Sequence, residues 1–154
     1  MWFPGTEIGH KLYSRMLSKS NNDASCSRFC LVVVQYNAEI DAKKLQSEIR
    51  AYTCHFTSLD PPQFDLRLVS EKDNARITGY SHNAVTPFGL LEKIPIILAK
   101  AIVTNMDMTQ FIWMGGGHIH LKVGVAVKEF INFTKSMVLD VTNVKKTLCD
   151  NETD

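Results

Sequence analysis

The stretch Gly79–Val103, GYSHNAVTPFGLLEKIPIILAKAIV, joins a loop of conformationally special residues to an apolar run. A plain connection would not need two glycines, a His-Asn pair and a Thr-Pro in such close succession. Because Pro fixes one backbone angle and Asn tolerates the left-handed region, this loop can present several free N–H groups on one side. The apolar part, IPIIL (94–98), reads as a short buried strand. We interpret the stretch as a site built from backbone beside its supporting strand, with an ordinary surface turn as the alternative.

Apolar segments on either side of this stretch predict many short strands and few helices. RFCLVVVQY (28–36) is apolar and β-branched, as expected of a strand buried on both faces. KLYSRMLS (11–18) alternates loosely, so the two segments read as a hairpin across the polar residues 20–27. Further strands are predicted at 65–69, 111–114, 120–125 and 137–141, and helices are predicted to begin at Asp41, Ser70 and Val127.

These elements predict a mixed α/β domain whose largely antiparallel or mixed sheet curls into a barrel flanked by short helices. Their irregular order argues against a doubly wound sheet. A length of 154 residues favours one domain spanning 1–154. We expect irregular structure over the first ten residues and a polar tail over 142–154.

Charge and composition exclude several classes of partner. Apolar residues make up 45% of the chain, charged residues 21%, and the net charge is +1. Without a basic stripe, no surface for long nucleic acid is expected. No apolar run approaches the ~20 residues of a membrane helix, and the N-terminus lacks the pattern of a signal peptide. We therefore expect a cytoplasmic protein without a membrane partner.

The four cysteines are scattered and do not indicate a metal site. They form no C-x-x-C pair, and no Cys/His doublet with zinc-ligand spacing is present. Scattered cysteines in a cytosolic protein are usually reduced. The expected cofactor content is therefore none, metals included.

Three consecutive glycines, Gly115, Gly116 and Gly117, directly follow the strand predicted at 111–114. A tight hairpin turn explains them in part, because glycine permits positive φ. Three in a row is more than a turn requires. The functional interpretation is a close approach of backbone N–H groups to a ligand, and both interpretations can hold together.

Two histidines, His82 and His118, lie inside or beside these Gly-rich segments. His118 and His120 would share one face of a strand, since strand side chains repeat every two residues. A third metal ligand is not evident. A solvated loop histidine is the simpler interpretation, and a catalytic role for His118 is the alternative.

The order of these motifs resembles the YbaK/EbsC family of aminoacyl-tRNA editing domains, which are related to the insertion domain of bacterial prolyl-tRNA synthetase. The HNAVT form of the loop is similar to the freestanding eukaryotic branch. The resemblance implies a mixed sheet curled into a barrel, and hydrolysis of the ester that joins a wrong amino acid to the 3′ end of a tRNA. The matching pieces, within residues 11–141, are LVVVQYNAEIDAKKL, ITGYSHNAVTPFG, IPIILAKAI and IWMGGGHIHLKVGV.

The resemblance also implies which residues form the site. The G-x-x-x-P loop of the family matches residues 83–87 and would hold the aminoacyl group with backbone atoms. The family's lysine on the first hairpin strand falls at Ser14, so Arg15 is a candidate catalytic residue after a one-residue shift, and His118 is a second. The family has a helix before this strand, so we expect a shortened N-terminus. The implied substrate-binding residues are Asn83, Ala84, Val85, Thr86, Pro87, Gly89, Gly115, Gly116 and Gly117.

Two hypotheses for function follow from the resemblance. The first is a trans-acting aminoacyl-tRNA deacylase, a second sieve for amino acids that a synthetase cannot reject by binding alone. Only the charged terminal adenosine of the tRNA would enter its pocket. The second is a catalytically degenerate module that binds tRNA 3′ ends, an aminoacyl-tRNA synthetase or a synthetase complex, and the missing lysine favours it.

Overall fold

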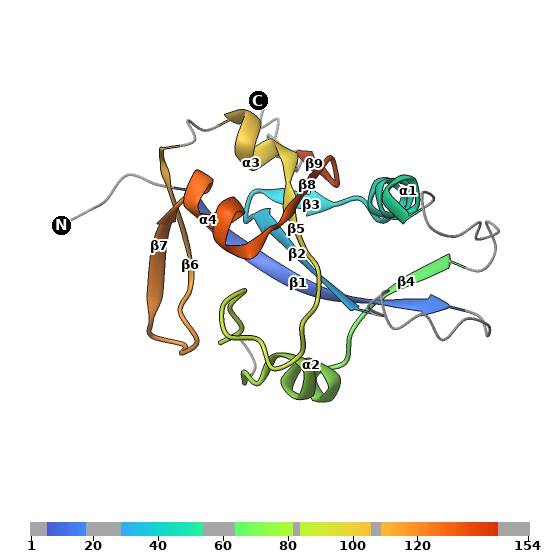
Figure 1. Ribbon diagram of the computed structural model, residues 1–154, viewed down its shortest axis with the longest axis horizontal. Coiled ribbons are helices and arrows are strands. Elements are labelled where there is room, and N and C mark those ends of the chain that lie inside the picture. The colour runs from blue at the N-terminus through green and yellow to red at the C-terminus, as the bar shows by residue number, and fades with distance from the viewer. Residues whose placement is uncertain (1–5, 18–28, 54–63, 82–83, 106–108, 145–154) are drawn as a thin grey trace, which may run out of the picture.

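The computed structural model describes residues 6–17, 29–53, 64–81, 84–105 and 109–144 (Figure 1). For residues 6–17 it describes the backbone only. The elements in chain order are β1 (Thr6–Leu17), β2 (Phe29–Gln35), β3 (Ala38–Ile40), α1 (Ala42–Thr53), β4 (Phe64–Leu68), α2 (Glu71–Thr78), β5 (Ile96–Ala99), α3 (Lys100–Asn105), β6 (Phe111–Gly115), β7 (Lys122–Ala126), α4 (Val127–Thr134), β8 (Met137–Leu139) and β9 (Thr142–Val144).

Most strands belong to one seven-stranded mixed sheet in the order β7-β6-β1-β2-β5-β8, with β4 also paired to β1. The pairs β1–β2, β1–β4 and β6–β7 are antiparallel, whereas β1–β6, β2–β5 and β5–β8 are parallel. The mixed α/β class is therefore confirmed. The expected barrel is not found, because among the described residues no pairing joins the outer strands β7 and β8.

The sheet has an apolar core because two of its neighbouring strands, β2 and β5, are buried on both faces. Leu31, Val32 and Val33 of β2 are at most 1% exposed, and Ile97 and Leu98 of β5 are fully buried. Parallel pairing between β2 and β5 suits such continuous apolar runs, which cannot face water on either side. The strand predicted at 28–36 is thus confirmed, and the strand predicted at 94–98 begins two residues later.

Ser70 and Gly79 cap the two ends of helix α2. The Ser70 side chain accepts a hydrogen bond from the Asp73 N–H, and Gly79 adopts the left-handed conformation (φ 80°) just past the last turn. The Gly79 N–H donates to the Ala75 carbonyl. A side chain at Gly79 would be strained by this φ and would meet Leu91. The cap thus turns the chain sharply into the loop that follows.

Several short elements were not predicted, and others begin at different residues. β1 starts at Thr6, within the segment expected to be irregular. Residues 142–144 form β9, which pairs with β3, and do not belong to the expected polar tail. Helix α3 follows β5 without a connecting loop. The predicted turn over 20–27 lies outside the described residues.

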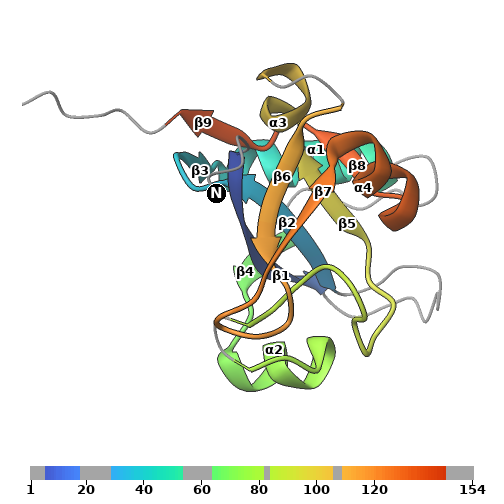
Figure 2. The same cartoon turned by 90° about the vertical axis from the view of Figure 1, so that its left-hand side faces the viewer.

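The helices cover the sheet on different sides and leave one hairpin projecting. In Figure 1, α2 lies below the sheet and α3 above it, while the β6–β7 hairpin stands at one side. After a quarter turn, β6 and β7 cross in front of β1 and β2 (Figure 2). The tip of this hairpin and the loop after α2 therefore lie at the same end of the molecule.

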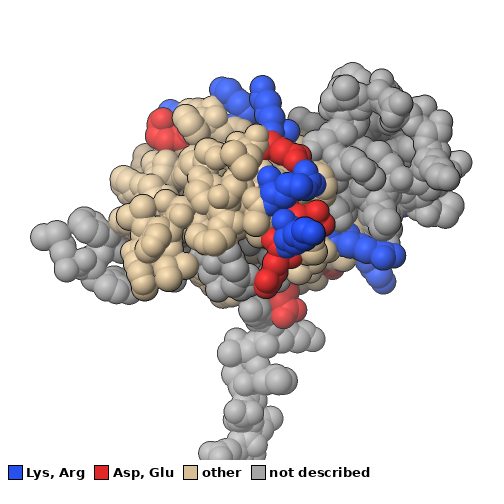
Figure 3. Space-filling view, turned by 90° about the horizontal axis from the view of Figure 1, so that it is seen from below, with Lys and Arg blue, Asp and Glu red and all other residues tan. Residues whose placement is uncertain are grey.

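The lower face of the molecule mixes charges of both signs beside a broad uncharged area (Figure 3). Arg76 of α2 shows the mixing, since its guanidinium lies 2.6 Å from Glu92 and 3.7 Å from Asp73. Such exposed pairs contribute little stability. No described helix has the length and apolarity that a membrane crossing requires.

Asp41 generates a prediction about pH, because it caps α1 and ties that helix to β9. Its carboxylate accepts hydrogen bonds from the Lys44 and Lys43 N–H groups and from the Asn143 amide. The Lys44 N–H, followed by the Asn143 amide, lowers the pKa of Asp41. A carboxyl with a lowered folded-state pKa stabilises the fold above its unfolded value of about 3.9 and loses that contribution as the pH falls through the folded value.

We therefore expect Asp41→Ala to lower the urea midpoint at pH 7 and to differ less from the parent protein at pH 3. Glu39→Ala, which removes an exposed carboxylate of the neighbouring strand β3, is the control and should shift neither midpoint appreciably. An equal loss at both pH values would show that the charge of Asp41 does not matter.

Candidate functional site

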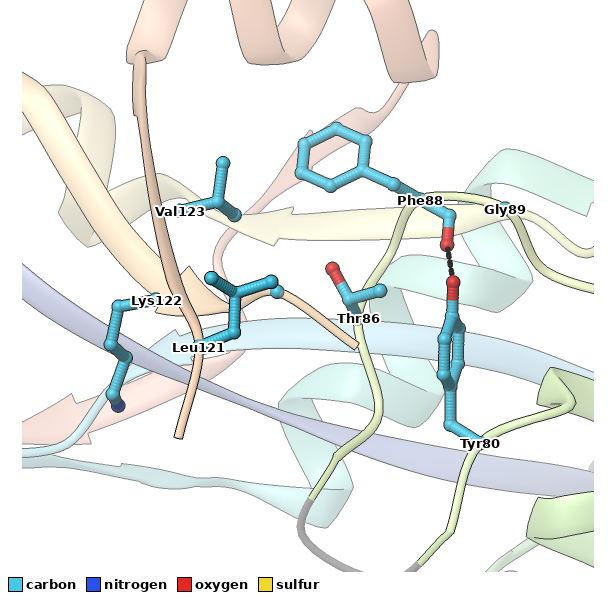
Figure 4. A pocket seen from close by; sticks show the side chains of 8 residues that line it. Tyr80, Thr86, Phe88, Gly89, Leu121, Lys122 and Val123 are labelled. Atoms are coloured by element: carbon cyan, nitrogen blue, oxygen red, sulfur yellow. Dashed lines mark hydrogen bonds between the residues drawn. The ribbon is translucent and has the colours of Figure 1, made fainter. Parts of the chain in front are cut away.

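A cavity of about 350 Å³ lies between the loop after α2 and the β6–β7 hairpin (Figure 4). The two walls come from segments that are distant in sequence, and each segment contributes residues predicted for the site. The lining residues are Tyr80, Thr86, Phe88 and Gly89 from the first wall, and Gly116, Leu121, Lys122 and Val123 from the second.

The two walls approach so closely that a side chain between them would have to displace a neighbouring atom by a few tenths of an ångström. A Cβ added to Gly115 would lie 3.1 Å from the Val85 carbonyl oxygen. A Cβ added to Gly117, which has φ 92°, would lie 3.0 Å from the Tyr80 ring. Glycine is therefore favoured at both positions by the close contact, and at Gly117 by its backbone conformation as well. The triple glycine therefore forms part of the hairpin turn and also part of the cavity wall.

Tyr80 fixes the shape of the first wall. Its hydroxyl donates a 2.6 Å hydrogen bond to the Phe88 carbonyl, which closes the loop into a ring (Figure 4). Its backbone N–H donates to the hydroxyl of Thr78 at the end of α2. The loop conformation is thus tied to the helix that precedes it.

The cavity walls are mainly apolar. Phe88 packs edge-on against Phe130 of α4, with ring centroids 5.9 Å apart, and lies 5.7 Å from the ring of Phe133. Leu121 and Val123 face the cavity from the hairpin (Figure 4). An apolar lining lowers the local dielectric and strengthens any hydrogen bond made inside.

Two polar side chains of the lining differ in where they point. The Thr86 hydroxyl points from the loop toward the space between Leu121 and Phe88, and it has no hydrogen-bond partner among the described residues. Thr86 itself is only 3% exposed. The Lys122 side chain points away from Thr86, and its Nζ lies 5.9 Å from the centroid of the Tyr36 ring. Of these two side chains, Thr86 is therefore the one aimed at the apolar part of the cavity.

The structure brings together part of the predicted binding set. Thr86, Gly89 and Gly116 line the cavity. Ala84, Val85 and Pro87 are buried in the same loop, while Gly115 and Gly117 hold the opposite wall against it. Asn83 and His82 lie outside the described residues.

The two candidate catalytic residues are not placed at the cavity by what is described. The backbone of Arg15 pairs with Leu66 of β4, at the opposite end of β1 from the residues that pair with β6, and its side chain is not described. His118 is exposed in the hairpin turn, where its Nδ1 accepts the N–H of His120. The expectation that these two histidines share a strand face is wrong, because β7 begins only at Lys122. No cluster of three potential metal ligands occurs among the described residues.

Several lining residues are not among those predicted from the sequence, although strand alternation gave a weak indication for one pair. Lys122 and Val123 are consecutive residues of a predicted strand, so their side chains are expected on opposite faces of it. Tyr80, Phe88 and Leu121 carried no such signal, because their loops have no regular period.

A family model described as the aminoacyl-tRNA editing domain matches residues 14–133. This chain belongs to that family. The match spans both walls of the cavity and the central strands that support them. A comparison with curated proteins found no match to this chain.

Solved structures share the fold at low sequence identity. A scaffold protein used for grafting linear epitopes has a TM-score of 0.65 and 17% identity, covering 90% of this chain and 72% of that one. A proposed trans-editing enzyme for prolyl-tRNA synthetase has a TM-score of 0.64 and 15% identity, with coverages of 90% and 71%. The hypothetical protein APE2540 has a TM-score of 0.63 and 14% identity, with coverages of 90% and 75%.

The Tyr80–Phe88 hydrogen bond generates a prediction about loop stability. Tyr80→Phe leaves the Phe88 carbonyl without this donor and should lower the free energy of unfolding by about 1 kcal/mol. Urea denaturation measures the loss, and Tyr36→Phe is the matched control because Tyr36 is 57% exposed and outside the cavity lining. Equal stability of the two variants would contradict the role given to Tyr80.

Proposed function

We propose that this editing domain is a trans-acting deacylase that hydrolyses the ester of a mischarged aminoacyl-tRNA. The observation that carries the proposal is the shared cavity of Thr86 and Gly116, which joins the two predicted loops in one small apolar site. Membership of the editing family supports an aminoacyl-tRNA as the substrate.

The size and lining of the cavity suit a small aminoacyl group and the terminal adenosine that carries it. Apolar pockets of about 300–1,000 Å³ with a few polar groups are typical of small-ligand sites. The mixed charges of Figure 3 suit a protein that contacts a tRNA end and not a long helix. The partner would then be the aminoacylated 3′ end, with a synthetase or synthetase complex as a further partner.

The reaction proceeds by attack of water on the ester carbonyl, with backbone N–H groups within residues 84–89 and 115–118 opposing the charge that develops on oxygen. The Ala84 and Gly116 N–H groups are not among these donors, because they donate to the Ser81 and Leu121 carbonyls, and Pro87 has no N–H. The 2′-hydroxyl of the terminal ribose positions the water, with Arg15 or His118 assisting. The reaction uses no metal and no cofactor. We place the protein in the freestanding branch of the family and in the cytoplasm, where charged tRNA is found.

Loss of ester from tRNAs charged with alanine, cysteine, serine or proline tests the proposal. The parent protein should deacylate at least one of them well above the rate in buffer. Arg15→Ala should reduce that rate by about 100-fold if Arg15 supplies the cation, whereas Arg67→Ala on the adjacent strand β4 should leave it unchanged. His118→Ala tests the second candidate in the same assay.

A second candidate function, a non-catalytic module for tRNA ends or synthetases, is favoured by one observation. Among the described lining residues there is no carboxylate or histidine to act as a general base. Retained binding of a synthetase or of an uncharged tRNA 3′ end, without deacylation of any charged tRNA, would favour this function over hydrolysis.

A further inference from the structure

Among the described residues, the buried Thr86 hydroxyl has no hydrogen-bond partner, unlike the hydroxyls of several helical threonines. Thr78 and Thr134 donate to the carbonyls of Asn74 and Phe130 in their own helices. The Thr86 Oγ has no such acceptor, although Thr86 is 3% exposed. A buried hydroxyl without a partner is costly. An acceptor that arrives with a ligand would remove this cost.

The surroundings of Thr86 favour an electronegative acceptor over a cationic donor. No aspartate or glutamate is among the lining residues that the structure describes, and the charged residue of the lining is Lys122. A cation in this cavity would have no carboxylate to balance it. An oxygen that gains negative charge, in contrast, would find a hydroxyl donor and no carboxylate among the described lining residues to oppose it.

The other hydroxyl of the lining is already engaged. The Tyr80 hydroxyl donates a hydrogen bond to the Phe88 carbonyl, so it cannot donate to a ligand unless that bond breaks and the loop opens. The Thr86 hydroxyl lies on the same short segment as the backbone N–H groups of Val85, Phe88 and Gly89, whereas the Ala84 N–H already donates to the Ser81 carbonyl. It therefore adds a side-chain donor to a wall that carries few main-chain donors.

We infer that Thr86 is a catalytic residue whose Oγ–H donates a hydrogen bond to the carbonyl oxygen of the scissile ester. The inference rests on the proposed deacylase function and deepens it by naming the side chain that stabilises the transition state. The ligand class is an aminoacyl ester of a terminal ribose. Because the carbonyl oxygen carries more charge in the tetrahedral intermediate, the hydrogen bond strengthens as the reaction proceeds.

The step is balanced without any external reactant besides water. The water oxygen bonds to the ester carbon as the carbonyl π pair moves onto oxygen, where the Thr86 hydroxyl meets it. When the carbonyl re-forms, the bond to the ribose oxygen breaks, and that oxygen takes up the proton lost by the water. The products are the free amino acid and a tRNA with its terminal hydroxyl restored.

Three substitutions test the inference in steady-state deacylation. Thr86→Val keeps the shape of the side chain and removes the donor, so kcat should fall about 100- to 1,000-fold with KM within about threefold of the parent value. Thr86→Ser keeps the donor and should stay within about tenfold. Thr104→Val removes a hydroxyl from α3, outside the cavity lining, and should change neither constant.

Two stable analogues separate this inference from the proposed function. Adenosine carrying alanine through a 3′-amide mimics the ground state, and the corresponding phosphonate mimics the charged intermediate. Thr86→Val should weaken phosphonate binding by about the factor lost in kcat and leave amide binding unchanged, as measured by calorimetry. If the parent protein deacylates no tRNA, the proposed function fails and the catalytic role of Thr86 fails with it. Deacylation by the parent protein with equal phosphonate binding by Thr86→Val would overturn the inference alone and leave the proposed function standing.

Equal binding of the phosphonate by Thr86→Val and the parent protein would overturn the inference, and so would equal weakening for both analogues. Thr86→Ala serves as a second donor-free variant if the valine form does not fold, which circular dichroism shows directly. A fall in kcat for Thr86→Ser as large as that for Thr86→Val would also count against the hydroxyl.

Discussion

The contact between the loop after α2 and the tip of the β6–β7 hairpin is the constraint on which the site depends. Gly115 meets the Val85 carbonyl, and Gly117 meets the Tyr80 ring, at distances that exclude any larger residue without movement. Close packing in protein interiors leaves little room for such movement. The cavity exists because these two segments touch at their edges while Leu121 and Val123 stand back from Phe88 (Figure 4).

The rest of the fold holds those two segments in place from opposite directions. The hairpin is anchored because β6 pairs with the start of β1, whose later residues pair with β2. The loop is anchored at one end by the capped terminus of α2 and at the other by β5, which lies beside β2. Both walls therefore depend on the central pair β1–β2. Damage to that pair would reach the cavity without touching any lining residue.

Local patterns in the sequence predicted what is decided locally. The Ser70 and Gly79 caps, the buried strand β2 and helix α4 follow from side-chain chemistry within a few residues. The pairing of β3 with β9 could not be predicted this way, because three-residue strands so distant in the chain carry little propensity of their own. The same holds for the cavity, where glycines and Thr86 were indicated but Tyr80 and Phe88 were not.

If the proposed deacylase function holds, the lining divides binding and chemistry between backbone and side chains. Main-chain groups and glycines would then form a wall that any aminoacyl ester can contact, because every such ester has the same carbonyl and ribose. Apolar side chains such as Phe88 and Val123 would then limit the size of the amino-acid side chain that the cavity accepts. An apolar wall discriminates one methylene by only about 10- to 200-fold. In the proposed deacylase, selection at this site would therefore be weak by itself, which suits a step that follows discrimination by a synthetase.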